Sequence, residues 1–490
     1  MARVWTAALS GVAGIPVEVE VRLSSQLPRV DVVGLPEAAV RESISRIRGA
    51  IAAAGARFPD RRVTVNLAPA ELRKDGAGLD LPIAIGILAA QGLIDEPALE
   101  QRGFIGELAL DGRLRVTRGS LAGVLALREA GLREAIVPAA SAVHAGQAPD
   151  IDVFGAASLS EVLSHLTGQR PLPVVEPTTS LTSPTASRDC LRDVRGQPLA
   201  KRALEVAAAG GHGLLLTGPP GTGKSLLARR LPTLLPPLGE LERLELFCIQ
   251  DAAGIAETDR PIPDRPPFRA PHHTASAAGL FGGGHPIRPG EVSLAHRGVL
   301  FLDELPEFDR RCLESLREIL EQGVVRIARA RSRSVLPARF QLVAAANPCP
   351  CGHLGAPGRD CRCDDATLQR YRRRLSGPLL DRIDLVITVQ DVPWEQLRQA
   401  GAGPTSETVR QRVELARMRA RARGGTTNAE LADATLDEAV CADGSALALL
   451  GRAVDRLALS ARGARRTLRV ARTVADLGDR SQVTCLLYTS

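Results

Sequence analysis

The segment GPPGTGKS at residues 218–225 constrains this chain more than any other part of its sequence. It fits the phosphate-loop pattern G-x-x-x-x-G-K-S, follows the apolar run LLL at 214–216 and precedes a predicted helix over 225–231. Glycines let backbone N–H groups close around phosphates, and the helix N-terminus adds a positive dipole. We expect Lys224 to pair with the phosphates and Ser225 to ligate Mg²⁺. The predicted nucleotide-binding residues are Gly218, Pro219, Pro220, Gly221, Thr222, Gly223, Lys224 and Ser225.

Two further buried strands are predicted downstream, and each ends in polar residues. The strand at 299–302 is followed by Asp303 and Glu304, and the strand at 342–346 is followed by Asn347. In one α/β unit with a phosphate loop, Asp303 is predicted to hold magnesium and Glu304 to polarise the attacking water. Asn347 is predicted to orient that water, with a simple turn residue as the alternative. The three segments predict a Mg-ATP-hydrolysing site on a parallel sheet.

Composition narrows the class of protein further. The sequence has no run of about 18 uncharged apolar residues, so no membrane span is predicted, and its start lacks the layout of a signal peptide. Nine cysteines without such a signal favour a reducing cytoplasm over a disulfide scaffold. We therefore expect a soluble, cytoplasmic protein. The net charge of +7 permits an acidic partner. Aromatic residues are only 3% of the chain, so nucleic acid would be held by charge rather than by stacked bases.

Four segments are predicted along the chain. Residues 1–168 alternate strand-like and helical runs. Residues 169–187 are rich in Pro, Ser and Thr and are predicted to be a linker. Residues 188–392 show the strand–helix alternation of a parallel α/β sheet. Residues 393–490 are rich in Ala, Leu and Arg, and they are predicted to form a helical bundle.

Together these motifs resemble those of AAA+ ATPases, and the residues between them narrow the resemblance. RAPHHTAS at 269–276, GGG at 282–284 and PGEVSLAHRGVLFLDE at 289–304 are similar to the magnesium-chelatase-like branch of that superfamily. The resemblance implies a P-loop AAA+ core with a parallel sheet, a C-terminal helical lid, and ATP and Mg²⁺ as ligands.

Two arginines are singled out by the same resemblance. SGPLLDRID at 376–384 resembles the segment that carries the arginine finger in this branch, which implies that Arg382 reaches the γ-phosphate of a neighbouring subunit. A finger of this kind works only in trans, so the resemblance implies a ring, and we predict a hexamer. The alternative is an ion pair of Arg382 with Asp381 or Asp384 of its own chain.

The lid is expected to supply a second γ-phosphate sensor. SARGA at 460–464 resembles the lid segment that does so, with Arg462 as the candidate and Arg465 and Arg466 as its rivals. After Gln482 the residues VTCLLYTS depart from the polar amphipathic helix that the resemblance implies, and a frameshifted or truncated lid is one interpretation.

Further motifs extend the resemblance to nearly the whole chain. VVGLPEAAVRES, NLAPA, KDGAGLDLPIA and GEL, which start at residues 32, 66, 74 and 106, are similar to the N-terminal domain of the ComM/YifB family. That domain resembles the α+β fold of Lon protease. A Lon-type site needs a serine in the K-D-G-x-S segment and a lysine downstream. Residues 77–79 are AGL, and no lysine follows Lys74 in this domain. We expect a scaffold or a DNA-contacting platform, not a protease.

Four cysteines lie in one short insert, as Cys349-Pro-Cys351 and Cys361-Arg-Cys363. Four thiolates can enclose a tetrahedral Zn²⁺ and staple a loop that is too small for its own core. Four free thiols are the alternative, and His353 is a spare ligand. A catalytic metal is not expected, because four cysteines leave no open coordination position.

An acid-free strand–turn–strand segment is predicted between residues 322 and 340. Its arginines are Arg326, Arg329, Arg331, Arg333 and Arg339. In the branch that the chain resembles, this hairpin projects into the pore of the ring, where repeated arginines would form a positive annulus suited to phosphates. Arg326, Arg329, Arg331 and Arg333 are the predicted DNA contacts, with a solvated charged turn as the alternative.

ComM-like proteins are ring ATPases that drive branch migration of DNA during recombination, notably in natural transformation, and the resemblance implies that activity here. The residues alone predict only a Mg-ATP-hydrolysing motor with a basic hairpin. The rival functions are a magnesium-chelatase motor, which helps to insert Mg²⁺ into a tetrapyrrole, and a MoxR-like ATPase that remodels a protein partner. A Lon-type protease is a third rival, which the missing dyad nearly eliminates.

Overall fold

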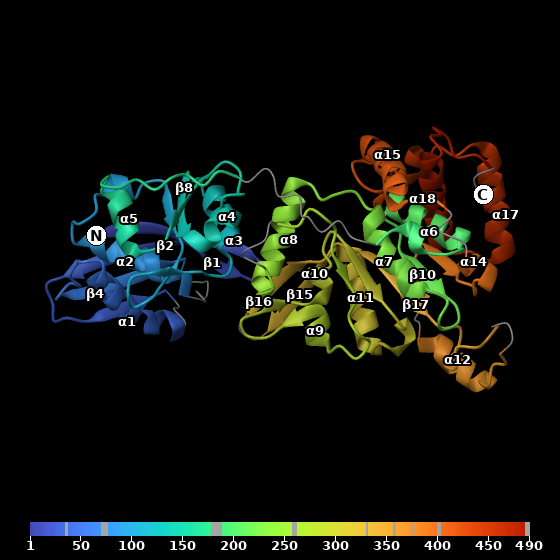
Figure 1. The fold of residues 1–490 in the computed structure, drawn as a ribbon, viewed down its shortest axis with the longest axis horizontal. Coiled ribbons are helices and arrows are strands. Elements are labelled where there is room, and N and C mark those ends of the chain that lie inside the picture. Colours follow the sequence, from blue (N-terminus) through green and yellow to red (C-terminus); the bar gives the residue numbers. More distant parts are fainter. Residues whose placement is uncertain are drawn as a thin grey trace.

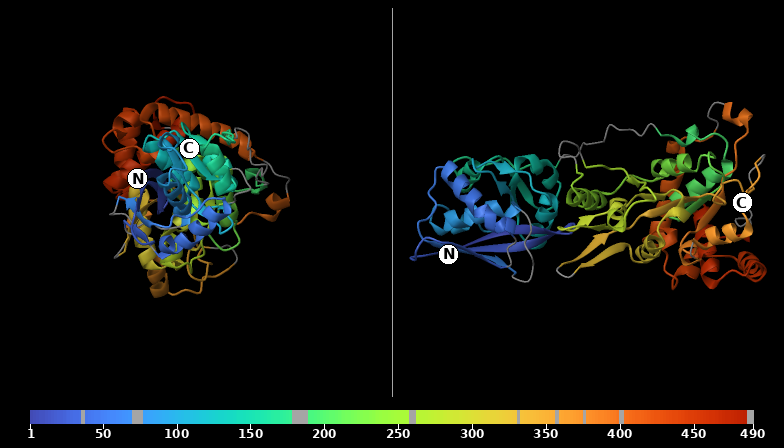
Figure 2. Two further views of the ribbon diagram at one scale, coloured as in Figure 1. Left: turned by 90° about the vertical axis from the view of Figure 1, so that its left-hand side faces the viewer. Right: turned by 90° about the horizontal axis from the view of Figure 1, so that it is seen from below.

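Three parts follow one another along the long axis of the molecule (Figure 1). The computed structural model describes residues 1–34, 38–69, 77–177, 189–256, 262–329, 332–355, 359–374, 377–398 and 403–485. The N-terminal part lies at one end, an α/β part in the middle and the C-terminal helices at the other end, and the view from below in Figure 2 shows the same order. In these ranges no helix is both long and apolar enough to cross a membrane.

The N-terminal part is built on a mixed sheet. Within the described residues its strand order is β3-β4-β2-β1-β5-β8-β9. The β1–β2 and β2–β4 pairs are antiparallel, and the other neighbours are parallel. Alternate residues of β2 and β4, such as Val19 and Val65, are fully buried, as expected for strands with one face on a core. The strands are β1 (Ala2–Ser10), β2 (Ala13–Ser24), β3 (Val30–Val33), β4 (Arg62–Ala68), β5 (Arg102–Phe104), β8 (Glu134–Pro138) and β9 (Asp152–Ala156), with β6 (Glu107–Leu108) and β7 (Leu114–Arg115) as a separate hairpin.

Helix α2 (Asp80–Ala90) is the central helix of this part. It is apolar on all sides, and its residues from Asp80 to Leu88 are buried. The buried Asp80 carboxylate is paired with Arg46 of α1 at 2.9 Å. The other helices are α1 (Ala38–Ala53), α3 (Ser120–Glu129), α4 (Ala139–Ala145) and α5 (Leu159–Leu166). The likeness of this part to Lon protease stays a prediction.

The middle part contains a parallel sheet with the strand order β11-β14-β17-β10-β18. Side chains of each inner strand alternate between two apolar clusters, one on each face. Helices α6, α7 and α15 cover one face, and α8, α9, α10 and α11 cover the other. The predicted parallel α/β fold is therefore confirmed. The strands are β10 (Leu214–Thr217), β11 (Phe268–Arg269), β14 (Val299–Leu302), β17 (Gln341–Ala346) and β18 (Leu385–Thr388).

The remaining elements of the middle part surround this sheet. The helices are α6 (Pro198–Gly210), α7 (Lys224–Leu234), α8 (Glu240–Ala253), α9 (Ala277–Phe281), α10 (Glu291–Leu294), α11 (Arg310–Gln322), α12 (Asp365–Arg374) and α13 (Gly377–Leu380). The predicted arginine hairpin is present as β15 (Val324–Arg329) and β16 (Ser332–Pro337), and β12 (Gly282–Gly283) pairs with β13 (Arg288–Pro289).

The C-terminal part is helical, as predicted. It comprises α14 (Trp394–Arg398), α15 (Ser406–Gly424), α16 (Leu436–Val440), α17 (Gly444–Leu457) and α18 (Ala461–Leu477). Helix α15 packs against α6, α7 and α18, and so joins this part to the sheet. The buried Arg472 is paired with Asp476 at 3.0 Å inside α18.

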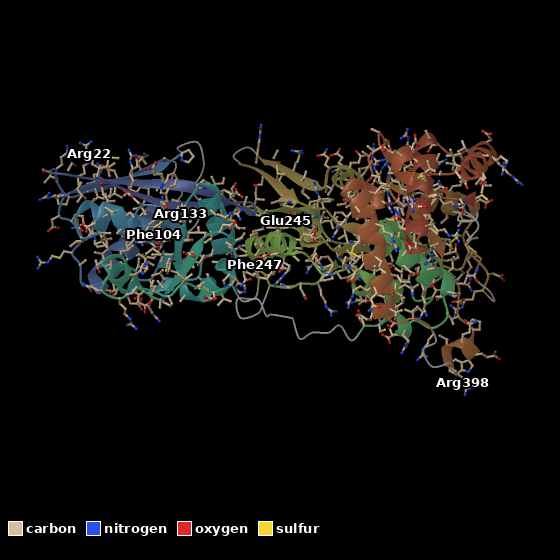
Figure 3. All side chains as sticks on the ribbon, turned by 90° about the horizontal axis from the view of Figure 1, so that it is seen from above. Arg22, Phe104, Arg133, Glu245, Phe247 and Arg398 are labelled. Atoms are coloured by element: carbon tan, nitrogen blue, oxygen red, sulfur yellow. The ribbon has the colours of Figure 1, made fainter. Side chains whose placement is uncertain are left out.

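Helix α8 joins the N-terminal part to the middle part. Its Leu244 and Phe247 belong to the same apolar cluster as residues of β1 and α3. Phe247, labelled at this junction in Figure 3, stacks on His144 of α4 with ring centroids 4.6 Å apart. The Asp251 carboxylate accepts a hydrogen bond from the Gly119 N–H at 2.7 Å. The two parts thus share a packed, apolar contact.

The start of the predicted linker lies against the N-terminal sheet. The Val175 N–H donates to the Val153 carbonyl at 2.8 Å, and the Leu172 N–H donates to His165 Nδ1 at 2.9 Å. The boundaries between the four predicted segments stay predictions.

Candidate nucleotide-binding site

The phosphate loop leaves the carboxyl end of β10 and runs into the N-terminus of α7. Gly221 and Gly223 have φ angles of 87° and 89°, in the left-handed region that favours glycine. A Cβ at either position would meet no heavy atom of the described chain within 4 Å. The loop therefore borders open space at a helix N-terminus, which is an arrangement that fits a phosphate group.

The Lys224 ammonium is held by three oxygen acceptors. Nζ donates to the Gly218 carbonyl at 2.7 Å, to the Pro219 carbonyl at 2.8 Å and to Asn347 Oδ1 at 3.2 Å. Burial lowers the pKa of Lys224, and the charges of Asp303 and Glu304 oppose that shift. Phosphate oxygens offer the same acceptor chemistry. The residue therefore fits the binding of a nucleoside triphosphate.

Ser225 and Asp303 come from different elements and meet beside the loop. Ser225 lies in the first turn of α7, Asp303 follows β14, and Ser225 Oγ donates to Asp303 Oδ2 at 2.7 Å. The second Asp303 oxygen accepts the Glu304 N–H at 3.0 Å. A hydroxyl and a carboxylate in contact are oxygen donors of the kind that Mg²⁺ takes together with nucleotide phosphates. The pair fits the predicted magnesium site.

Glu304 adopts a left-handed backbone conformation, with a φ of 52°. Its side chain is half exposed, and Oε2 lies 3.4 Å from His273 Nδ1. The His273 ring also packs against His272, with centroids 4.1 Å apart. Sequence reasoning missed His273 as a site residue. It lies in the RAPHHTAS segment, which signalled the resemblance but did not show which side chain faces Glu304.

Asn347 follows β17 and lies at the same edge of the sheet. Besides its side-chain contact with Lys224, its carbonyl accepts the Tyr371 hydroxyl of α12 at 3.2 Å. The structure therefore brings together the phosphate loop, Ser225, Asp303 and Asn347, with Glu304 directly beside Asp303.

Arg382 lies at the opposite edge of the sheet from the phosphate loop. It precedes β18, which is parallel to β10 with Leu385 opposite Leu214 and Thr388 opposite Thr217. The loop follows the carboxyl ends of these strands, and Arg382 precedes their amino ends, so a four-residue strand of about 13 Å separates the two. Arg382 is therefore remote from the phosphates of its own chain.

Arg382 and Arg462 share one acidic partner, Glu321 at the end of α11. Arg382 forms an ion pair with Glu321, and Arg462 Nη2 lies 4.0 Å from Glu321 Oε1. Arg382 thus forms an ion pair within its own chain, as the alternative stated, but its partner is Glu321 instead of Asp381 or Asp384. The Asp384 carboxylate contacts His212 Nδ1 at 2.9 Å. The rivals Arg465 and Arg466 donate to backbone carbonyls of Asp433 and of Leu380 and Ile383. The two predicted γ-phosphate arginines thus lie together.

A family model described as magnesium chelatase, subunit ChlI, matches residues 190–397. A model described as subunit ChlI of Mg-chelatase matches residues 19–141, and one described as magnesium chelatase, subunit ChlI C-terminal, matches residues 403–485. The chain is 43% identical to the competence protein ComM of Haemophilus influenzae, over 99% of this chain and 95% of that protein. The chain belongs to the ComM/YifB family of magnesium-chelatase-like proteins. It is also 42% identical to YifB of Escherichia coli, over 98% of this chain and 94% of YifB. It is 46% identical to a Mycobacterium tuberculosis protein, over 98% of this chain and 96% of that protein.

The hairpin of this ComM/YifB family member presents arginines on its exposed face. In the β15–β16 pairing, Arg326 is opposite Val335 and Ala328 is opposite Arg333, so Arg326 and Arg333 share one face. Both are exposed, whereas Val325 and Leu336 on the other face are buried. The Arg329 side chain and Arg331 lie outside what the structure describes. Of the four arginines predicted to contact DNA, the structure thus describes the side chains of Arg326 and Arg333.

The four predicted metal-binding cysteines are brought together. The Sγ atoms of Cys349, Cys351, Cys361 and Cys363 all lie within 4.8 Å of one another. Cys349 is buried, and the other three are partly buried. No other group of three or more potential metal ligands occurs in the described part of this family member.

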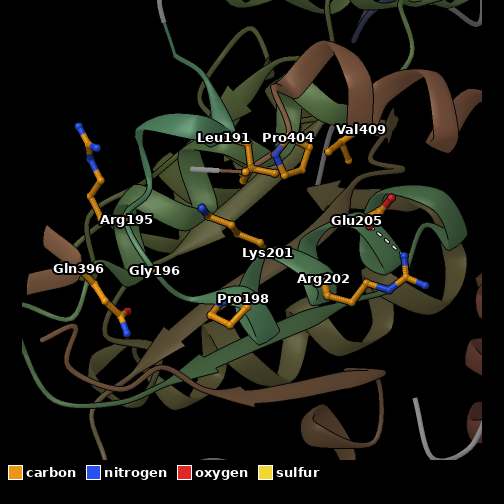
Figure 4. A pocket seen from close by; sticks show the side chains of 11 residues that line it. Leu191, Arg195, Gly196, Pro198, Lys201, Arg202, Glu205, Gln396, Pro404 and Val409 are labelled. Atoms are coloured by element: carbon orange, nitrogen blue, oxygen red, sulfur yellow. Dashed lines mark hydrogen bonds and ion pairs between the residues drawn. The ribbon is translucent and has the colours of Figure 1, made fainter. Parts of the chain in front are cut away.

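A separate cavity of about 530 Å³ lies beside α6 and the start of α15 (Figure 4). Leu191, Lys201, Pro404 and Val409 are among its lining residues, which include none of the predicted site residues. Burial lowers the pKa of Lys201, and the nearby charge of Arg195 lowers it further. The cavity is distinct from the nucleotide site, and Lys201, one of the three lysines of the chain, adds a positive charge to it.

Proposed function

We propose that this chain is the subunit of a ring-forming, Mg-ATP-driven DNA motor, which promotes branch migration during homologous recombination and natural transformation. The observation that carries the proposal is the pair of contacts at the phosphate loop. Lys224 Nζ donates to Asn347 at 3.2 Å, and Ser225 Oγ donates to Asp303 at 2.7 Å. These contacts join residues more than 75 positions apart in the chain into one site, as ATP hydrolysis requires.

Each residue of this site has a chemical task in the proposal. The loop N–H groups and Lys224 bind the phosphates of ATP, and Ser225 and Asp303 hold Mg²⁺. When bound, Mg²⁺ neutralises the charge that develops between the β- and γ-phosphates. Glu304 takes the proton of the attacking water, and Asn347 orients that water.

Ring assembly is part of the proposal because Arg382 and Arg462 lie across the sheet from Lys224. A neighbouring subunit has to present its phosphate loop to that edge for these arginines to reach a γ-phosphate. Arginines supplied from a neighbour in this way raise hydrolysis by about 10³-fold or more. We propose that six subunits close the ring.

DNA is the proposed partner because of the exposed arginines of the hairpin. Arg326 and Arg333 face solvent on one side of β15–β16, where each subunit would add their charges to a common channel. The ComM relative is named a competence protein, and a role in competence is consistent with DNA as the substrate. The proposed site of action is the cytoplasm.

The decisive experiment measures the steady-state ATPase rate with and without single-stranded and forked DNA, with Lys224→Ala as the blank. We expect strong stimulation by DNA, which weakens in Arg326→Ala/Arg333→Ala. Arg452→Ala/Arg456→Ala on α17 removes the same charge elsewhere and is the matched control. Equal stimulation in both double variants, or a robust rate that ignores DNA, contradicts the DNA-motor proposal.

A second candidate function is a magnesium-chelatase-like or MoxR-like ATPase that remodels a protein partner. It is favoured by the family models, all three of which describe magnesium-chelatase subunit regions. An ATPase rate that is indifferent to DNA and rises with a protein client would favour it over the DNA motor.

A further inference from the structure

We infer that Cys349, Cys351, Cys361 and Cys363 bind one Zn²⁺ ion and that this metal knot holds the nucleotide site in shape. The first argument is the spacing of the sulfur atoms. Sγ of Cys349 lies 3.3 Å from Sγ of Cys351 and 3.7 Å from Sγ of Cys361, and the last two are 3.6 Å apart. With Zn–S bonds of about 2.3 Å, the sulfurs of a regular tetrahedron are about 3.8 Å apart. The thiols thus already surround a zinc-sized centre.

Disulfide bonds do not account for this arrangement. A disulfide would bring two sulfurs to about 2.05 Å and leave the pairs separate, whereas Cys349 and Cys351 both contact Cys361 as free thiols. Zinc binding requires the thiols to lose their protons to solvent, after which four thiolates fill the tetrahedral shell. The ion is therefore structural, with no open position for a substrate.

The described residues of the loop that carries the cysteines include few apolar side chains. Its described residues between β17 and α12 form no helix or strand, and most of them are Gly, Pro, Cys or charged. A loop without its own apolar core needs a staple to hold one conformation. The four sulfur atoms come from both ends of this loop and lie within 4.8 Å of one another, so a bound zinc ion would hold the two ends together.

The knot directly contacts the nucleotide site. Cys349 is two residues after Asn347, whose side chain accepts from Lys224. Gly352 has a φ of 81°, and a Cβ there would lie 2.7 Å from Cδ of Pro220 in the phosphate loop. The knot therefore packs on the phosphate loop and fixes the chain that leaves Asn347. Loss of the metal is expected to displace Asn347. Because Asn347 is proposed to orient the attacking water, this displacement would lower the rate of ATP hydrolysis.

The test of metal binding uses the full chain, purified without added metal. Elemental analysis is expected to find about one zinc per chain, released when a mercurial titrates the thiols. Cys361→Ser/Cys363→Ser is expected to lose the zinc, whereas the control Cys190→Ser/Cys441→Ser, which removes two cysteines outside the knot, retains it. A zinc-free wild-type protein, or equal zinc in both double variants, overturns the inference.

A spectroscopic measurement keeps the inference testable if the knot variant does not fold. Wild-type protein from which zinc has been exchanged for Co²⁺ is expected to show the intense visible bands of tetrahedral thiolate coordination. A spectrum of six-coordinate, oxygen-bound Co²⁺ contradicts the four-cysteine site.

The link to hydrolysis rests on the proposed ATPase function, whereas the metal content does not. In folded Cys361→Ser/Cys363→Ser we expect kcat to fall by about 10-fold to 100-fold, as for a displaced catalytic group, while the binding of a fluorescent ATP analogue persists. If the wild-type protein binds zinc but has no ATPase activity, the proposed function is rejected and the inferred zinc site is retained. Unchanged kcat in the zinc-free variant would reject the positioning role.

Discussion

Glu304 shows how one backbone conformation aims a side chain at this site. The residue follows Asp303 at the end of β14 and has a φ of 52°, a conformation that costs a non-glycine residue about 1 kcal/mol or more. The turn separates the two carboxylates, so that Asp303 contacts Ser225 while Glu304 extends toward His273. Neighbouring acids in the sequence thus acquire different surroundings, which suits one for metal binding and the other for proton transfer.

The prediction at this scale concerns Glu304→Gln. The amide keeps the size of the side chain but cannot accept a proton, so we expect kcat to fall by about 10²-fold to 10⁴-fold while ATP binding persists. Glu307→Gln is the matched control, because Glu307 is three residues away and pairs with Arg374 at 2.6 Å. The measurement is single-turnover hydrolysis beside nucleotide binding, and equal losses in the two variants would contradict the role of Glu304.

Helix α8 connects the N-terminal part to the base of the arginine hairpin. One side of the helix stacks Phe247 on His144. On the other side, Glu245 lies 3.0 Å from His296 Nε2 and 3.1 Å from Arg297. His296 Nδ1 accepts the N–H of Arg339, two residues after β16. Because Nδ1 accepts this hydrogen bond, the ring proton is on Nε2, which lies beside the Glu245 carboxylate.

The prediction at the scale of elements is an acid-dependent loss of stability. The contact with His296, and then the positive charge of Arg297, lower the pKa of Glu245 from 4.5 to about 2, against the effect of burial. A lowered folded-state pKa stabilises the fold fully above about pH 4.5, and this contribution disappears as the pH falls toward 2. Glu245→Gln should lower the unfolding free energy on the order of 1 kcal/mol near neutral pH, since the carboxylate is partly screened by solvent.

Urea unfolding of Glu245→Gln and wild type near neutral pH and near pH 3 measures this effect. The difference between the two proteins should shrink at the lower pH. Glu240→Gln, on the exposed first turn of α8, is the control. A difference that stays constant with pH would contradict the assigned pKa shift.

For the whole molecule, the main feature is that Arg382 and Arg462 lie far from their own phosphate loop. The five parallel strands of the described sheet place every carboxyl end, with Lys224, Asp303 and Asn347, at one edge. Arg382 is at the other edge and shares Glu321 with Arg462. In the proposed ring, each chain therefore carries two incomplete halves of the catalytic site, and we expect these halves to meet only between chains.

The prediction at this scale is complementation between two inactive variants. Lys224→Ala removes the phosphate-binding ammonium but keeps the proposed arginine finger. Arg382→Ala removes the proposed finger but keeps the phosphate-binding lysine. Mixed rings contain interfaces with both intact groups, so mixing should restore ATPase activity that neither variant shows alone. Mixtures of Lys224→Ala with Glu304→Gln place both lesions in the same half-site and should stay inactive. No restoration in the first mixture would contradict action in trans.

Much of the site was predictable because its parts are short and contiguous. Local sequence patterns predict the phosphate loop, the strands before Asp303 and Asn347, and the hairpin of Arg326 and Arg333. The repeat of apolar residues along a segment shows directly whether it forms a strand or a helix. The pairing of Glu304 with His273 was not predictable in the same way, because the two residues are 31 positions apart and either histidine of the pair satisfies the motif.

The sequence by itself determined the family and the parallel sheet, and it predicted the nucleotide site and the cysteine cluster. The tertiary structure alone decided that Arg382 and Arg462 lie across the sheet on Glu321 and that the cysteine loop packs on Pro220. The physical reason is that spacing along a chain records which groups exist and how each segment folds. Strand order, strand direction and the packing of loops decide which of those groups meet, and these depend on the burial of the whole core.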